Sequence, residues 1–383
     1  MIESIELLVE FVKTYTVLFL MSSLALFIGC EEETTESGEI YKIYITLQNV
    51  DKVVVINGET GEIIREVDAD VIPNVADNPH YVIIDEVNKT WYVTLISSGY
   101  VLKYDLLTDE FLDSVFVGNQ PALMDIEPTG DYLYVSRFMP MMGMETASTQ
   151  VHQINVANMA VDSVDVGASS PHGIAISSNG NELWVASNQA SHFFRIKTDS
   201  LGVEGYEPES FKIGSNVPDA IGINDGLYEA LELFISPDGQ KLYISCSDMA
   251  VNEVRVYSTS NGDSLDTYSF GMMGMQPWHL VTDPEGDHLY VASRMANTCS
   301  IVDLETGSIS YIENTIFDTP HGIGVSPDGS RLYMTSSAMM SGGMSYLHII
   351  DTKTNSVIEN VQLGEGVAAT GLAVMQSLCS DCD

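Results

Sequence analysis

The chain has 383 residues and is strongly acidic, with 15 Lys plus Arg against 54 Asp plus Glu and a formal net charge of -39 at pH 7. Nucleic acids and anionic membrane surfaces repel such a charge, so nucleic-acid binding is excluded as a function. The acidity instead indicates solubility in saline surroundings, with loose binding of divalent cations as a lesser alternative. Five cysteines are too few for a disulfide framework, so an apolar core must stabilise the fold.

The N-terminal segment has the pattern of an export signal. Residues 17–28 (VLFLMSSLALFI) form an apolar run of signal-peptide length that is short for a membrane span. Gly29 and Cys30 follow this run, and a small residue before a cysteine at that point resembles the bacterial lipobox. The resemblance implies a signal peptide over residues 1–29 and a lipid on Cys30 that holds the protein on the outer membrane. An ordinary cleaved signal or a short anchor is the alternative, and both also imply export.

An acidic run, residues 31–39 (EEETTESGE), follows Cys30 directly. An acidic run at this place resembles the surface-export signal of lipoproteins in the Bacteroidetes, which would expose the protein on the cell surface. The alternative is that residues 30–40 are only a solvated tether. Both interpretations stay open from the sequence.

A short apolar strand, a tight turn and a second strand recur six times along the chain. The copies return about every 40 to 50 residues, a period that is typical of propellers, solenoids and arrays. The clearest copy is PHGIGVSPDGSRLYMT at residues 320–335. The other copies, aligned on the turn glycine, are residues 171–186, 277–292 and 121–136, with weaker matches at residues 230–245 and 79–94.

Each copy is followed by two more strand-like runs, so one repeat supplies four strands. In the last repeat, residues 346–351 (YLHIID) and 357–363 (VIENVQL) are alternating and rich in β-branched residues, as strands are. A four-stranded antiparallel meander repeated around an axis is the blade of a β-propeller. Six complete units begin near His80, Ala122, His172, Leu231, Trp278 and His321.

The two ends of the repeat region complement each other. Residues 41–67 supply three strands without a first one, and residues 370–374 (TGLAV) imitate the first strand HGIGV at residues 321–325. We therefore predict an all-β fold over residues 41–378. It is a seven-bladed β-propeller of four-stranded antiparallel blades, closed by pairing of the C-terminal strand into the first blade. Because closure removes open sheet edges, we expect a monomer.

The turn and second strand also carry a family resemblance. SPDGSRLYMT (residues 326–335), SPDGQKLYIS (236–245) and DPEGDHLYVA (283–292) resemble the YVTN-type repeat of seven-bladed propellers in bacterial envelope and surface-layer proteins. The resemblance covers residues 41–376 and implies the fold and an envelope location. It implies no activity and supplies no catalytic residues, since propellers host many unrelated functions.

Strand alternation places three parts of every blade on one edge, which we call the upper face. These parts are the start of the first strand, the loop after the second strand and the loop into the next blade. The first residue of each inner strand should line the upper mouth of the central channel. Four of the eight histidines gather there, namely His80, His172, His279 and His321, with Trp278 beside them. The alternative for each histidine is a structural hydrogen bond to a neighbouring blade.

Methionines are concentrated in the same predicted loops. They occur at residues 139–144 (MPMMGM), 272–275 (MMGM) and 339–344 (MMSGGM), and also at Met249 and Met295. A core methionine belongs on a strand, as Met334 does, so loop methionines must be covered or bind something. The predicted metal ligands are His80, His172, His279, His321, Met141, Met142, Met144, Met272, Met273, Met275, Met339, Met340 and Met344.

Three interpretations of this surface compete. Thioethers and imidazoles together favour Cu(I), and thioethers are not lost to disulfides in an oxidising compartment. Flexible methionines also form adaptable surfaces for a partner protein or an apolar ligand. The third interpretation is that the long loops only pack on one another. We prefer copper binding or sequestration, with the adaptable surface as the alternative.

An enzyme at the upper mouth is the second alternative, because some seven-bladed propellers are lactonases or lyases. Trp278, Arg137 and Arg294 are candidate ligand-binding residues, and the two arginines could steady an anionic ligand. The insertion at residues 215–229 could cover the channel as a lid. Asp219, Asp225, Glu229 and Glu232 lie in or beside it. No nucleophile, base and acid are defined by spacing, so we name no catalytic residue.

The remaining cysteines fall into two groups. Cys246 and Cys299 are expected on strands as separate buried thiols without a function. Cys379 and Cys382 form a C-x-x-C tail over residues 379–383, which could bind a soft metal or close as a small disulfide ring. An oxidising envelope favours the ring.

Overall fold

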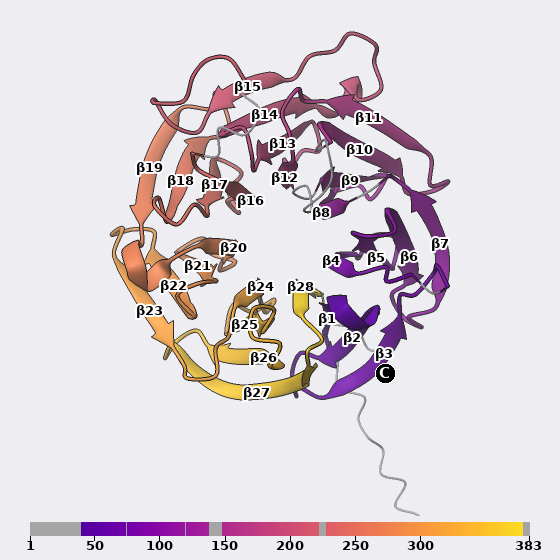
Figure 1. The fold of residues 1–383 in the computed structure, drawn as a ribbon, viewed down its shortest axis with the longest axis vertical. Coiled ribbons are helices and arrows are strands. Elements are labelled where there is room, and N and C mark those ends of the chain that lie inside the picture. The colour runs from indigo at the N-terminus through magenta and orange to yellow at the C-terminus, as the bar shows by residue number, and fades with distance from the viewer. Residues whose placement is uncertain (1–39, 74, 119, 138–147, 222–226, 378–383) are drawn as a thin grey trace, which may run out of the picture. The chain divides into compact units, whose positions relative to one another are not determined.

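The computed structural model describes residues 40–73, 75–118, 120–137, 148–221 and 227–377. They form seven four-stranded antiparallel sheets arranged as blades in a ring (Figure 1), so the predicted all-β seven-bladed propeller is confirmed. Three 3-10 turns, η1 (Gln48–Val50), η2 (Thr198–Ser200) and η3 (Gly271–Gly274), are the helical elements of these residues. Within the described ranges, no helix has the length and apolar character needed to cross a membrane.

Blade 1 joins the two ends of the described chain. It consists of β28 (Ala369–Val374), β1 (Lys42–Leu47), β2 (Lys52–Asn57) and β3 (Ile63–Asp68), in that order from the channel outward. The antiparallel register of β28 and β1 sets Ala373 opposite Tyr44 and Leu372 opposite Ile45. The predicted closure by the C-terminal strand is therefore confirmed.

The next three blades follow in chain order around the ring. Blade 2 consists of β4 (Pro79–Asp85), β5 (Thr90–Leu95), β6 (Tyr100–Asp105) and β7 (Phe111–Phe116). Blade 3 consists of β8 (Pro121–Ile126), β9 (Tyr132–Arg137), β10 (Gln150–Asn155) and β11 (Val161–Asp165). Blade 4 consists of β12 (Pro171–Ile176), β13 (Glu182–Ser187), β14 (His192–Lys197) and β15 (Glu209–Lys212).

The last three blades complete the ring, and in each of them the first strand is again innermost (Figure 1). Blade 5 consists of β16 (Ala230–Ile235), β17 (Lys241–Cys246), β18 (Glu253–Ser258) and β19 (Ser264–Ser269). Blade 6 consists of β20 (Pro277–Thr282), β21 (His288–Ser293), β22 (Thr298–Asp303) and β23 (Ile309–Glu313). Blade 7 consists of β24 (Pro320–Val325), β25 (Arg331–Ser336), β26 (Met344–Asp351) and β27 (Ser356–Glu365).

The core lies between neighbouring blades. The second strand of blade 7, β25, is buried from Leu332 to Ser336, whereas its outermost strand, β27, is mostly exposed. A strand covered on both faces carries a nearly continuous apolar run, which is why the LYMT-type segments stand out in the sequence. The aromatic residue in that run packs on the next blade, as Tyr44 of blade 1 does on Trp91 of blade 2, with ring centroids 5.0 Å apart.

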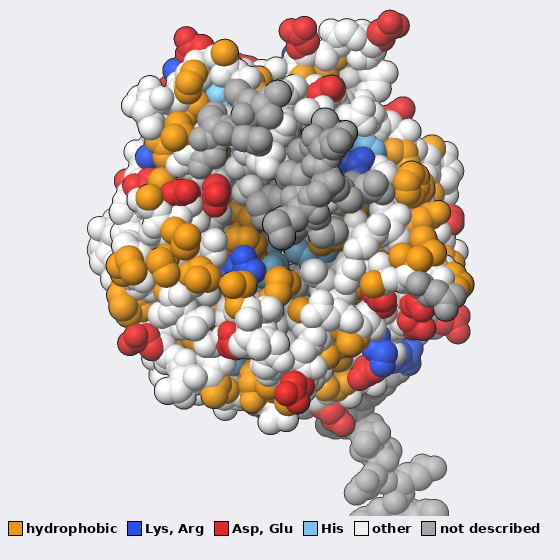
Figure 2. All heavy atoms as spheres, viewed as in Figure 1, with side chains coloured by type: hydrophobic (Ala, Val, Ile, Leu, Met, Phe, Trp, Pro, Cys, Tyr) orange, Lys and Arg blue, Asp and Glu red, His pale blue; other side chains and the backbone are white. Residues whose placement is uncertain are grey.

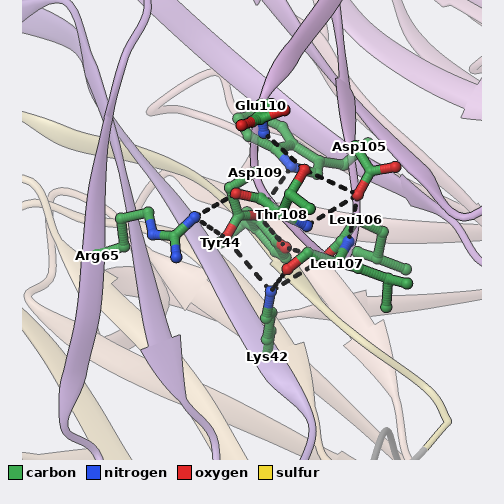
Figure 3. Close-up of polar contacts among 10 residues, drawn as sticks. Lys42, Tyr44, Arg65, Asp105, Leu106, Leu107, Thr108, Asp109 and Glu110 are labelled. Carbon is green, nitrogen blue, oxygen red and sulfur yellow. Dashed lines mark hydrogen bonds and ion pairs between the residues drawn. The ribbon is translucent and has the colours of Figure 1, made fainter. Parts of the chain in front are cut away.

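A buried ion pair ties the closing blade to blade 2 (Figure 3). Lys42 Nζ lies 3.3 Å from Asp109 Oδ2, and each side chain is 1% exposed. Tyr44 donates its hydroxyl to Asp109 Oδ1 at 2.8 Å, and Trp91 donates its indole N–H to the same oxygen at 3.1 Å. The carboxylate is therefore satisfied by several donors, as a buried charge must be.

The turns between first and second strands interlock on the opposite edge, which we call the lower face. Gly329 has φ 71, and a Cβ at this position would lie 3.2 Å from Pro284 Cδ of the preceding blade. Gly286 has φ 76 and faces Pro237 of the preceding blade, where an added Cβ would lie 3.5 Å from Pro237 Cδ. Only glycine adopts this positive-φ conformation easily, and at Gly329 a side chain would also press on the neighbouring proline. The recurrent Pro-x-Gly turn therefore reflects blade-to-blade packing.

Candidate functional site

The four predicted histidines are buried at the start of the inner strands. His80 lies on β4, His172 on β12, His279 on β20 and His321 on β24. Figure 2 shows histidine side chains at the centre of the ring, beside a Lys or Arg side chain and hydrophobic groups. The ring centroids of His279 and His321 are 5.0 Å apart, and those of His80 and His321 are 5.8 Å apart. The structure therefore brings three of the four predicted histidines into contact.

Both ring nitrogens of His321 are engaged in hydrogen bonds. Trp278 donates its indole N–H to His321 Nε2 at 3.0 Å, so Nε2 is an acceptor and the ring proton sits on Nδ1. His321 Nδ1 lies 3.1 Å from the carbonyl oxygen of Thr370, to which it donates. His172 Nδ1 donates in the same way to Leu231 O at 2.7 Å. These bonds to neighbouring blades agree with the structural alternative for His321 and His172.

His321, His80 and His172 are neutral at physiological pH. Burial lowers the pKa of His321 and of His80 well below the usual value, and the nearby histidines and Arg294 lower both further. Burial also lowers the pKa of His172 to about 4. The upper mouth therefore offers uncharged imidazoles next to a permanent cation.

Arg294 is the charged group of this mouth. It follows β21 directly, and its guanidinium carbon lies 4.3 Å from the centre of the Trp278 ring. Its Nη2 lies 3.7 Å from Met339 Sδ, while its Nε is buried and has no hydrogen-bond partner among the described residues. Burial lowers the pKa of Arg294. Within the described ranges, no carboxylate lies within 4.0 Å of this guanidinium.

The other arginines show how unusual it is for an arginine of this acidic chain to lack a carboxylate partner. Of the six arginines, four pair with a carboxylate within 4.0 Å in the part of the chain that the structure describes, namely Arg65, Arg195, Arg255 and Arg331. Arg137, at the end of β9, donates to the carbonyls of Val117 and Gly118 and to His152 Nε2. Burial lowers the pKa of Arg137 to about 10.

The predicted methionine ligands are only partly gathered by the described structure. Met272 is 74% exposed and Met340 is 68% exposed, and Met273 is exposed as well. Met275, Met339 and Met344 are half-buried, and Met339 contacts Arg294. Met141, Met142 and Met144 lie outside the described residues, as do Cys30, Cys379 and Cys382. Among the residues that are described, no cluster of three or more His, Cys, Asp or Glu is arranged to hold a metal ion.

The insertion before blade 5 is described only in part, and Asp225 lies outside the described residues. Asp219 Oδ1 pairs with Lys212 Nζ at 2.8 Å, and its side chain is 95% exposed. Burial raises the pKa of Glu229. A lid over the channel stays a prediction.

A second layer of polar residues lies just below the histidines. Glu232 Oε2 lies 3.0 Å from His279 Nδ1 and accepts the backbone N–H of Leu280 at 2.6 Å. Tyr81 stacks on the His279 ring with centroids 6.2 Å apart. Tyr81, Glu232 and His279 line a small void of about 20 Å³, which has room for a single water molecule. The wider part of the channel, about 530 Å³, lies below them toward the lower face.

His279 and Glu232 were each named from the sequence, but their pairing was missed, although the repeat contains a signal for it. The position after the rim residue is glycine in three blades, at Gly173, Gly322 and Gly371. A Cβ on Gly322 would lie 2.6 Å from Thr370 O, so the inner strands approach too closely there for a side chain. Glu232 and His279 occupy the same position in blades 5 and 6. Blades 2 and 3 carry Tyr81 and Leu123 at this position. Glu232 and His279 are therefore the ionisable residues at a position that is glycine or uncharged in the other five blades.

The chain was compared with known protein families, curated proteins and solved structures. No family model matches the chain. Antigen Lp49 of Leptospira interrogans is 26% identical over 240 residues, which cover 51% of this chain and 50% of that protein. The chain therefore matches only about half the length of this curated relative.

Solved structures match over most of the chain. A candidate 6-phosphogluconolactonase from Bacteroides fragilis has a TM-score of 0.66 and 15% identity, covering 90% of this chain and 100% of that one. The periplasmic gluconolactonase of Pseudomonas aeruginosa has a TM-score of 0.64 and 16% identity, covering 88% and 99%. Kuenenia stuttgartiensis hydrazine synthase has a TM-score of 0.60 and 18% identity, covering 75% and 80%. At these identities the matches show that the chain has the β-propeller fold, and they show the fold alone.

Proposed function

We propose that this protein is an exported propeller that binds a small anion, a carboxylate or a phosphate ester, at the upper mouth of its channel. The observation that carries the proposal is the environment of Arg294. Its guanidinium is stacked on Trp278 and partly desolvated, and no carboxylate among the described residues compensates its charge. An arginine is left in this state at a cost, because burial of a charge is unfavourable unless a partner is present.

An anionic ligand would supply the missing partner. Hydrogen bonds between a guanidinium and a carboxylate or phosphate are charge-assisted and contribute about 1.5–3 kcal/mol each. The stack on Trp278 holds the planar group in one orientation, so less rotational freedom is lost on binding. The neutral imidazoles of His80, His172 and His321 nearby add no negative charge that would oppose an anion. The net charge of -39 means that attraction must arise locally, at this mouth.

The fold neighbours suggest a class of anion to try first. Two of them are named as a gluconolactonase and a candidate 6-phosphogluconolactonase, so sugar acids are related to their named activities. Gluconate carries a carboxylate, and 6-phosphogluconate carries a carboxylate and a phosphate. A lactonase activity belongs to the same proposal as its enzymatic form, and hydrolysis of glucono-δ-lactone measures it directly.

Export and lipid anchoring are part of the proposal. They are supported by the apolar run at residues 17–28, by the lipobox-like Gly29-Cys30 pair and by the relative that is named as an antigen. Residues 1–39 lie outside the described ranges. Labelling with a radioactive fatty acid, compared between the wild type and Cys30→Ala, tests the lipid on Cys30.

Copper binding is the second candidate, favoured by the contact of His279 with His321 and by the closeness of Met339 to the mouth. Two features weigh against it. Both nitrogens of His321 are already bonded, and the Met339 thioether faces the Arg294 cation, which would repel Cu(I). The exposed Met272 and Met340 equally suit an adaptable surface for a protein partner. Metal analysis after Cu(I) loading tests the candidate, and stoichiometric copper would favour it.

Calorimetric titration tests the proposed anion site. We expect gluconate or 6-phosphogluconate to bind the wild type, and neutral D-glucose to bind the upper mouth much more weakly. Arg294→Gln should weaken anion binding about tenfold or more, since it removes a charge-assisted bond. The control is Lys52→Gln, which removes one positive charge from an exposed pair with Glu66. Equal binding by Arg294→Gln and the wild type would refute the proposal.

A further inference from the structure

Blade 3 differs from the other blades in one residue, at the centre of its third strand, on the side that faces the next blade. In every blade, the central position of the third strand lies opposite an aromatic residue of the second strand. In blade 3 this pair is Gln153 and Tyr134. The equivalent third-strand residues are Val55, Lys103, Arg195, Val256, Ile301 and Ile349.

Those other side chains fill the space between blades in one of two ways. Val55, Val256, Ile301 and Ile349 are apolar and pack there. Lys103 and Arg195 are long and reach across, since Lys103 Nζ donates to Val156 O at 2.9 Å and Arg195 Nη1 donates to Ser260 O at 3.0 Å. Gln153 is neither apolar nor long enough to cross to blade 4.

A cleft of about 450 Å³ therefore stays open between blades 3 and 4. Blade 3 lines it with Tyr132 and Tyr134 from β9, Gln153 from β10 and Asp162 from β11, and Glu127 comes from the turn after β8. Blade 4 contributes the other wall, which is formed by Asn181, Thr198, Asp199 and Leu201. A volume of this size is in the range of small-molecule sites.

Two polar side chains face this cleft, and one of them has unused hydrogen-bonding capacity. Gln153 is 7% exposed, and its Nε2 donates to Tyr134 OH at 3.2 Å. Gln153 also lines the cleft. Glu127 Oε2 is buried without a partner in the same part of the chain, and burial raises the pKa of Glu127. A buried carboxylate oxygen is normally satisfied, so Glu127 Oε2 indicates a missing partner.

The chemistry of the lining selects the kind of partner. No lysine or arginine is among the described residues that line the cleft, so it does not suit an anion. No metal-holding group of His, Cys, Asp or Glu was found in the described ranges either. Carboxylates, side-chain amides and hydroxyls form a ring of acceptors and donors next to two tyrosine rings. Sugar hydroxyls bond to such planar polar groups, and the apolar face of a sugar ring packs on an aromatic ring.

We infer that the cleft between blades 3 and 4 is a binding site for a neutral saccharide. Gln153, Glu127 and Asn181 would bond its hydroxyls, and Tyr132 would pack against one ring. Glu127 and Asn181 come from turns between first and second strands, so the site lies on the lower-face side of the boundary between the blades, away from the histidines of the upper mouth. It does not depend on the anion site at the upper mouth.

The test combines binding measurements with a substitution that copies the equivalent residue of another blade. The probes are cellobiose, maltose, lactose and N,N′-diacetylchitobiose, titrated by calorimetry and by saturation-transfer NMR. Gln153→Lys copies the Lys103 arrangement of blade 2, so it should fill the cleft without unfolding the protein. We expect at least one probe to bind the wild type and both Gln153→Lys and Asn181→Ala to weaken that binding about tenfold.

Two controls make the outcome decisive. Asn261→Ala changes an exposed turn asparagine of blade 5 and should leave saccharide binding unchanged. Arg294→Gln should also leave it unchanged, which separates this site from the upper mouth. Thermal unfolding of Gln153→Lys should be as cooperative as that of the wild type. If no probe binds the wild type at concentrations up to about 10 mM, or if Gln153→Lys and Asn181→Ala bind as the wild type does, the inference is wrong.

Discussion

Trp278 and His321 are joined by a hydrogen bond across the boundary between blades 6 and 7, with 3.0 Å between indole Nε1 and imidazole Nε2. The bond holds His321 in its Nδ1-protonated form and fixes the indole ring on which Arg294 is stacked. One pair of residues therefore links the neutral histidines in the channel to the cation at its mouth. The arrangement of the upper mouth depends on this pair.

Loss of this bond should be visible at His321. In the wild type, protonation of Nε2 must break the bond from Trp278, which disfavours the charged form. Trp278→Phe removes the donor and should raise the pKa of His321, as followed by NMR titration of the ring. Trp184→Phe is the control, because Trp184 Nε1 is buried and has no hydrogen-bond partner among the described residues. An unchanged His321 titration in Trp278→Phe would contradict the role of the bond.

Stability should fall as the pH is lowered from about 6.5 to about 4, the range between the unfolded and folded pKa values of the histidines. Burial lowers the pKa of His172 and of His348 to about 4, and of His152 to about 3. In that range the unfolded chain binds protons that the folded chain does not, so the free energy of unfolding decreases. Asp125 acts in the opposite direction, because burial raises its pKa to about 6.

These three histidines, together with His80 and His321, outweigh Asp125 and the less buried Asp51, Glu127 and Glu229, whose pKa values burial also raises. We therefore expect a net loss of on the order of 1 kcal/mol or more per pH unit. Urea unfolding at pH 7 and at pH 5 measures the difference. His348→Gln should reduce the pH dependence, because it removes one of the three groups. Stability that stays constant or rises from pH 7 to pH 5 would show that the histidines are not buried as described.

Asp109→Asn should strongly destabilise the closure of the ring. The substitution leaves the buried Lys42 ammonium without its counter-charge (Figure 3), at a cost of about 3–5 kcal/mol. The matched control is Glu66→Gln, which breaks the exposed pair with Lys52 and should cost at most about 1 kcal/mol. Denaturant unfolding compares the two variants. A cost for Asp109→Asn as small as that for Glu66→Gln would mean that the pair contributes little.

Much of the fold can be predicted from the sequence, for a physical reason. A propeller repeats one local pattern of strands and turns, and each copy of PHGIGV and SPDGSRLYMT satisfies the same packing. The position of the rim follows from strand direction alone, so His80, His172, His279 and His321 could be placed at one mouth. The closing role of residues 370–374 followed from their likeness to a first strand.

The side-chain partners could not be predicted, because they join residues of different blades. The Glu232 and His279 pair depends on two inner strands that are far apart in sequence. The lack of a carboxylate near Arg294 depends on where every other side chain lies. The cleft beside Gln153 appears only when seven faces are compared in space. The methionine pattern suggested a metal site. In the structure, however, Met272 and Met340 are exposed to solvent.

The most direct test of the proposed anion site is a crystal of the protein soaked in tungstate, a heavy-atom analogue of phosphate. We predict an anomalous peak within hydrogen-bonding distance of the Arg294 guanidinium at the upper mouth. The peak should be absent from a crystal of Arg294→Gln soaked in the same way. Tungstate bound elsewhere and not at Arg294 would contradict the anion site. In that case, copper retained at His279 and His321 would favour the copper-binding candidate.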